Sequence, residues 1–169
     1  MRIVVVGGWA PSLINFRGPL LEALVAAGHE VIGMGAEGTP SLVDRLARLG
    51  VAFEELPLER AGLDPLADAR AVAHLIARFR TLRPDLVFAY TIKPVIYASL
   101  AARIARVPRR AALITGLGFA FSQSGTLRQR AITMTARGLY RVALRGVHAL
   151  LFQNPDEDRK STRLNSSHT

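Results

Sequence analysis

The sequence predicts an α/β fold, a Rossmann-like doubly wound parallel sheet with helices on both faces. Two observations predict it. Short apolar runs alternate with longer helical segments along the chain. These runs are continuous rather than interrupted by polar residues at every second position, which is typical of parallel strands buried on both faces. Because crossovers between parallel strands are right-handed, such a chain winds into a doubly wound sheet.

The first part of the chain predicts three strands and two helices. The first apolar run is short, β-branched and followed by Gly7 and Gly8, which is typical of a buried strand. The first helix has an apolar face and ends at Gly28. Thr39 is expected to cap the second helix, with Pro40 at its first position. The expected elements are a strand over residues 2–6, a helix over 15–27, a strand over 29–34, a helix over 41–49 and a strand over 51–55.

The second part repeats this alternation after a connector at residues 57–64. Pro84 and Asp85 separate a long helix from the fourth strand, since a helix rarely continues through the residue before proline. A glycine-containing loop is expected over residues 116–125. The expected elements are a helix over 65–82, a strand over 86–90, a helix over 94–105, a strand over 110–115, a helix over 126–145 and a strand over 148–152.

Composition limits the classes of protein that are possible. The length of 169 residues suits one domain, and half of the residues are hydrophobic, so an ordered core is expected. The absence of cysteine excludes disulfides and cysteine-ligated metal. No apolar run approaches the length of a membrane helix or resembles a signal peptide, so we expect a cytoplasmic protein. The net charge of +9 favours nucleic acid, an anionic membrane or phosphate-bearing ligands, although a GC-rich genome also enriches arginine.

Candidate ligand-binding residues follow the strands at their carboxyl ends, where doubly wound sheets bind ligands. Gly7 and Gly8 follow the first strand, and their alternative role is a tight turn. Lys93 follows the fourth strand and suits a phosphate, unless it is a solvated loop lysine. The fifth loop contributes Thr115, Gly116 and Gly118. The first loop, GGWAPS, matches neither GxGxxG nor the P-loop pattern, and the sequence has no HxxxH pattern, so we expect no bound cofactor and no metal.

A stripe of arginines is expected on the helix over residues 126–145. Arg130, Arg137 and Arg141 share one face, beside an apolar stripe. A basic amphipathic helix of this kind can lie on an anionic membrane, here the inner face of the plasma membrane. The alternative is an ordinary solvated helix face.

Three segments resemble the N-terminal half of a GT-B fold glycosyltransferase of the family 4 type. They are PSLINFRGPLLEALVAAGHEV, LRPDLVFAYTIKPVIYASLAARIARVP and ITGLGFAF, in this order along the chain. The resemblance is strongest to bacterial enzymes that build cell-surface polysaccharides on lipid-linked acceptors. It assigns residues 1–157 to the acceptor-side domain.

The resemblance implies retaining transfer of a sugar from a nucleotide-sugar to a lipid-linked saccharide, without metal and without a nucleic-acid partner. A second domain, which this chain lacks, would bind the donor, so the chain is expected to be inactive alone. Many members of the family have a histidine where this sequence has Thr115. Two alternatives stay open: a non-catalytic acceptor-binding subunit that works with a separate donor-binding chain, and a fragment of a GT-B nucleotide-sugar 2-epimerase.

The last residues do not continue the pattern. DRKSTRLNSSH, residues 158–168, has no apolar period, and it back-translates into a common sequencing-adapter sequence. We therefore expect residues 158–169 to be a non-native, disordered tail.

Overall fold

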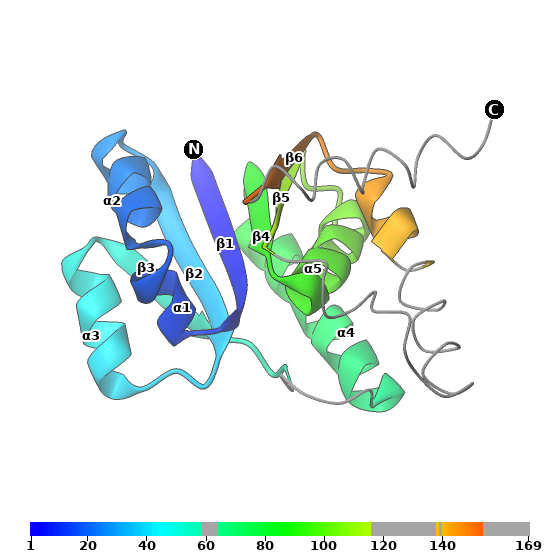
Figure 1. The fold of residues 1–169 in the computed structure, drawn as a ribbon, viewed down its shortest axis with the longest axis horizontal. Helices are drawn as coiled ribbons and strands as arrows, with labels where there is room; N and C mark the ends of the chain where they lie inside the picture. The colour runs from blue at the N-terminus through cyan, green and yellow to red at the C-terminus, as the bar shows by residue number, and fades with distance from the viewer. Residues whose placement is uncertain (59–63, 116–137, 139, 154–169) are drawn as a thin grey trace.

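The computed structural model describes residues 1–58, 64–115, 138 and 140–153. Its labelled elements form alternating strands and helices (Figure 1). They are β1 Arg2–Trp9, α1 Pro11–Asn15, α2 Gly18–Ala26, β2 Glu30–Ala36, α3 Pro40–Arg48, β3 Val51–Glu55, α4 Pro65–Leu82, β4 Leu86–Tyr90, α5 Ile92–Ile104, β5 Arg109–Ile114 and β6 Ala149–Phe152. The predicted α/β alternation is confirmed, and the expected Thr39 cap accepts a hydrogen bond from the backbone of Leu42.

The strands form one sheet in the order β3-β2-β1-β4-β5-β6, and every neighbouring pair is parallel. From β1 the chain first extends the sheet through β2 and β3, and then returns to the other side of β1 with β4. The direction of winding therefore switches between β1 and β4. In sheets of this kind the crevice beyond the carboxyl ends of these two strands is the usual ligand site.

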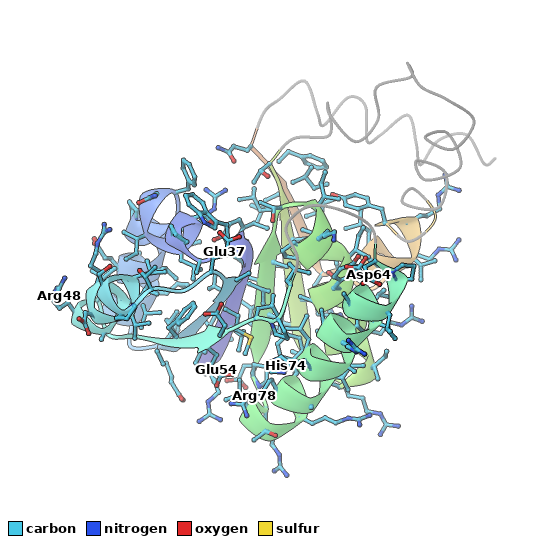
Figure 2. All side chains as sticks on the ribbon, turned by 90° about the horizontal axis from the view of Figure 1, so that it is seen from below. Glu37, Arg48, Glu54, Asp64, His74 and Arg78 are labelled. Atoms are coloured by element: carbon cyan, nitrogen blue, oxygen red, sulfur yellow. The ribbon has the colours of Figure 1, made fainter. Side chains whose placement is uncertain are left out.

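Helices cover both faces of the sheet, with α1, α2 and α3 on one side and α4 and α5 on the other (Figures 1 and 2). Alternate residues of β1 supply the two cores: Ile3 and Val5 pack toward the first group, Val4 and Val6 toward the second. Burying an aliphatic side chain of this size contributes about 1.5–3 kcal/mol. The two cores fix the strand ends that form the site.

The helix expected over residues 15–27 is present, but its expected start is wrong, because α2 begins at Gly18 and Asn15 is the last residue of α1. Pro19 explains the break. In one continuous helix its ring would clash with the carbonyl group of Asn15, four residues earlier. Proline is tolerated only in the first turn, so a new helix begins at Gly18 and Arg17 becomes its N-cap residue.

The expectation that Gly7 and Gly8 form a loop is also wrong, since both lie inside β1. The pairing of β1 with β2 shifts register between Val6 and Trp9. Such irregularities are common where a strand bends near a ligand site, and glycine suits them. The strand therefore runs to Trp9, which lies opposite Ala36.

Candidate functional site

The carboxyl ends of β1 and β4 are packed tightly against each other through Gly7 and Tyr90. A Cβ atom on Gly7 would lie 2.5 Å from the ring carbon Cζ of Tyr90, so only glycine leaves room for the ring. Tyr90 is only 1% exposed. The Tyr90 ring therefore occupies the space that a side chain at position 7 would fill.

A hydrogen-bond chain holds the Tyr90 hydroxyl. Its oxygen lies 2.7 Å from Ser12 Oγ in α1, and Ser12 Oγ donates to the carbonyl oxygen of Trp9 at 2.5 Å. A serine hydroxyl has one hydrogen, so Tyr90 is the donor to Ser12. Burial raises the pKa of Tyr90 to about 12, although the Ser12 hydrogen bond and the charge of Arg17 oppose this. Tyr90 is therefore neutral at physiological pH.

Thr91, directly after β4, has a strained backbone. Its φ of 68° and ψ of 156° lie in a region that β-branched residues rarely adopt. Its Oγ1 atom is buried and has no hydrogen-bond partner among the described residues. A Cβ atom on Gly8 would lie 3.2 Å from this oxygen. Gly8 and Thr91 thus meet at the point where the winding of the sheet switches.

Lys93 lies in the first turn of α5, at the edge of the sheet where the sequence predicts the ligand site. Its positive charge is balanced by a carboxylate. Its Nζ atom lies 3.1 Å from Asp68 Oδ1 in the first turn of α4, and their side chains are 18% and 15% exposed. Burial, together with a hydrogen bond to Asp68 and the Asp68 charge, raises the pKa of Tyr97. Asp68 therefore links two α5 side chains to α4, a role that the sequence analysis did not assign.

Arg17 lies on the opposite side of this edge and was not singled out from the sequence. Its guanidinium carbon lies 5.0 Å from the centre of the Tyr90 ring, a cation–π distance. One terminal nitrogen donates to Gln153 Oε1 at 3.2 Å and the other to the carbonyl oxygen of Phe16 at 3.1 Å. Its Nε atom is buried and has no hydrogen-bond partner among the described residues. Pro19 is the sequence signal for this position, because it forces a new helix to begin at Gly18 and so makes Arg17 the N-cap residue.

The remaining predicted residues are only partly described. Thr115 follows β5 and is half-buried, at the same edge of the sheet. Arg141 is exposed on a short helical stretch, residues 140–144. Gly116, Gly118, Arg130 and Arg137 lie outside the described residues, as does the segment 158–169. The structure thus brings Gly7, Gly8, Lys93 and Thr115 to one edge.

An ion pair joins β3 to α4. Glu54 of β3 and Arg78 of α4 lie close together (Figure 2). Arg78 Nε donates a hydrogen bond to Glu54 Oε2 at 2.7 Å. This ion pair raises the pKa of Arg78. Among the described residues, no three His, Asp or Glu side chains are arranged to hold a metal ion. Within the same ranges, no helix is both long and apolar enough to cross a bilayer.

Solved structures share this fold. UDP-GlcNAc 2-epimerase from Methanocaldococcus jannaschii superimposes with a TM-score of 0.61 at 13% identity, over 99% of this chain and 43% of that chain. MurG from Acinetobacter baumannii superimposes with a TM-score of 0.58 at 12% identity, over 92% of this chain and 42% of that one. The architecture is that of the N-terminal half of a GT-B fold.

Sequence comparison is more specific. A curated Campylobacter jejuni protein is 25% identical over 154 residues, which are 91% of this chain. It is named N,N'-diacetylbacillosaminyl-diphospho-undecaprenol alpha-1,3-N-acetylgalactosaminyltransferase. The matched region is 40% of that protein, so this chain spans less than half of its relative. The glycosyl transferase 4-like domain model matches residues 17–168, nearly the whole chain. This chain belongs to the glycosyl transferase 4-like family.

Proposed function

We propose that this chain is the acceptor-side domain of a retaining glycosyltransferase, and that it holds a lipid-linked saccharide for transfer of a sugar from a nucleotide-sugar. The observation that carries the proposal is the family match over residues 17–168. The C. jejuni relative, whose name specifies transfer onto a sugar attached to diphospho-undecaprenol, supports the class of acceptor.

The proposed acceptor site is the edge around the β1–β4 switch point. Gly8 leaves room for Thr91 and Pro94, and Gly7 makes room for the Tyr90 ring, so the two glycines let the end of β1 pack closely against the residues that follow β4. Lys93 and Thr115 line the same edge, and we extend the site to Gly116 and Gly118 in the segment that follows. Positioning the acceptor hydroxyl in this way lowers the entropic cost of the reaction.

Transfer needs the donor as well as the acceptor. In the proposed reaction the acceptor oxygen forms a bond to the anomeric carbon, the bond from that carbon to the diphosphate oxygen breaks, and the hydroxyl proton passes from the acceptor to the departing diphosphate. Stabilising the departing diphosphate is usually the largest part of such catalysis. We assign that task to a second domain, so the chain alone should not transfer sugar.

The epimerase alternative has less support than transfer. The epimerase structures are 13–14% identical to this chain, and this level of likeness reports the fold alone. The family and sequence matches both point to glycosyl transfer. The acceptor-binding subunit remains compatible with the same site, because it differs only in whether the donor domain is on a separate chain.

The test is ligand preference. Calorimetry should compare a short-chain polyprenyl-diphosphate-linked N-acetylglucosamine with UDP-N-acetylglucosamine on the 169-residue chain. We expect the lipid-linked saccharide to bind at least about tenfold more tightly, a difference of about 1.4 kcal/mol. Tighter binding of the nucleotide-sugar, or turnover of it by the chain alone, would overturn the proposal.

A further inference from the structure

The positive charge of Arg17 has no acidic partner among the described residues. Its contacts there are a ring, a neutral amide and a backbone carbonyl. Lys93 and Arg78, by contrast, each contact a carboxylate. Arg17 is only partly exposed, so water screens its charge less than it would at the open surface.

The Nε atom of Arg17 is the second unusual feature. It is buried and lacks an acceptor within the described part of the chain. Burying a donor without an acceptor is destabilising, and most such groups in native proteins are satisfied by protein, water or ligand. An arginine presents Nε and a terminal nitrogen as a planar fork, which matches two oxygens of one anion.

The surroundings hold this fork in place. Pro19 fixes Arg17 at the break between α1 and α2, and the Tyr90 ring beneath it is held by Ser12. The first backbone N–H groups of α2 have no side-chain cap, and Gly18, the first residue of this helix, is buried. The helix start thus adds positive potential beside Arg17.

We propose that Arg17 is the anion-binding residue of this edge, and that its Nε and the amino end of α2 together take a phosphoryl group. The inference rests on the proposed function, in which acceptor and donor both carry a diphosphate. The shared chemistry is therefore a phosphoryl anion, either from the lipid diphosphate of the acceptor or from the nucleotide diphosphate of the donor. The competing role is a structural brace that joins α2 to the end of β6 through Gln153.

The experiment measures binding of inorganic pyrophosphate to the 169-residue chain by calorimetry. Arg17→Ala should weaken binding about tenfold or more, and Arg17→Lys, which keeps the charge but loses the fork, should be intermediate. The matched control is Arg48→Ala, because Arg48 is an exposed arginine at the end of α3, remote from the edge (Figure 2). It should leave the affinity within about twofold of the native chain, as a distant surface charge is screened.

Gln153→Ala separates the ligand role from the brace. It removes the amide acceptor and leaves the guanidinium, so pyrophosphate affinity should stay within about threefold of the native chain. A brace predicts instead that Arg17→Ala and Gln153→Ala lower the urea midpoint equally and leave pyrophosphate affinity unchanged. That result would overturn the proposal. If Arg17→Ala does not fold, Arg17→Lys and Gln153→Ala still decide between the two roles.

Two further ligands identify the source of the phosphoryl group. Loss of farnesyl diphosphate binding in Arg17→Ala, with UDP binding retained, assigns Arg17 to the lipid-linked acceptor, and the reverse assigns it to the donor. Equal affinity of native and Arg17→Ala chains for all three anions would overturn the inference, even if lipid-linked saccharide still binds. Conversely, Arg17-dependent pyrophosphate binding without saccharide binding would sustain the inference and refute the proposed function.

Discussion

Lys93 and Asp68 form an ion pair that joins the first turn of α5 to the first turn of α4, with Nζ 3.1 Å from Oδ1. Both side chains are less than one-fifth exposed. Removing one partner leaves the other charge in a poorly solvated position. We expect Asp68→Asn to lower the free energy of unfolding by about 1–3 kcal/mol, measured by urea titration.

A double-mutant cycle with Lys93→Met isolates the pair. The double variant should lose less stability than the sum of the single variants. The surface pair between Arg2 and Glu30, whose side chains are 38% and 58% exposed, is the matched control and should couple by no more than about 0.5 kcal/mol. Equal coupling in both cycles would mean that the Lys93 pair behaves as an ordinary surface pair.

Three glycine-to-alanine variants should have graded effects on stability. Gly7→Ala places a methyl group against the buried Tyr90 ring and should cost about 1–3 kcal/mol or more. Gly8→Ala makes contacts of 3.2–3.7 Å and should cost about 1 kcal/mol or less. Gly18→Ala meets no atom of the described residues within 4 Å and should stay within about 0.5 kcal/mol of the native chain. Thermal unfolding would rank them, and a neutral Gly7→Ala would show that Tyr90 moves aside easily.

Stability should fall in alkaline solution through Tyr90. Its pKa is raised in the folded chain to about 12, mainly by burial, from an ordinary value near 10. The unfolded chain therefore releases its proton first as the pH rises. This contribution to stability, about 3 kcal/mol, is complete below about pH 10 and is lost as the pH rises through about 12.

Tyr90→Phe is the variant that tests this titration. It keeps the ring under Arg17 but has no ionisable group, so its stability should decline less steeply between pH 10 and 12. Tyr97, whose pKa is also raised, should still contribute to the decline in that variant. Identical slopes for the native and Tyr90→Phe chains in urea titrations at each pH would contradict the prediction.

Arg130, Arg137 and Arg141 are predicted to attach the chain to anionic membranes. Each basic residue near such a surface contributes about 1 kcal/mol, so three give roughly a hundredfold in binding before screening by salt. Co-sedimentation should show salt-sensitive binding to anionic vesicles and little binding to neutral ones. Replacing all three with glutamine should abolish it. Unchanged binding by the triple variant would mean that these arginines do not bind the membrane.

The segment 158–169 is predicted to contribute nothing to the fold. It has no apolar face with which to pack. A chain that ends at Glu157 should therefore melt at the same temperature as the 169-residue chain, or slightly higher, in a thermal scan. A melting temperature several degrees lower would mean that the segment packs on the domain.

The order of elements was predictable because continuous apolar runs and glycine or proline boundaries are local signals. The strands 51–55 and 86–90 and the helix 65–82 have the expected bounds. The break between α1 and α2 was missed although Pro19 is visible in the sequence. The prediction followed the amphipathic pattern of residues 15–27 and overlooked the clash between the Pro19 ring and the carbonyl group of Asn15.

The site was less predictable because its chemistry depends on contacts between distant segments. Lys93 was placed at the correct edge, but nothing local indicates that Asp68, twenty-five residues earlier, pairs with it. Gly7 was expected to serve a ligand, and its spatial neighbour is Tyr90. Arg17 drew no attention among twenty arginines, because only the folded chain shows that its Nε lacks an acceptor.

The position of β1 between β2 and β4 has a consequence for synthesis on the ribosome. β2 and β3 emerge soon after β1 and can pair on one side of it. The other side waits until residues 56–85 have been added, which takes about 2–6 s at typical elongation rates. During that interval one edge of β1 is unpaired in the nascent chain. Val4 and Val6 are also exposed, because the helices that cover them in the folded chain, α4 and α5, are not yet complete. An unpaired edge beside apolar side chains is prone to aggregate. We therefore expect residues 2–6 to be the first segment of this chain that a ribosome-associated chaperone binds.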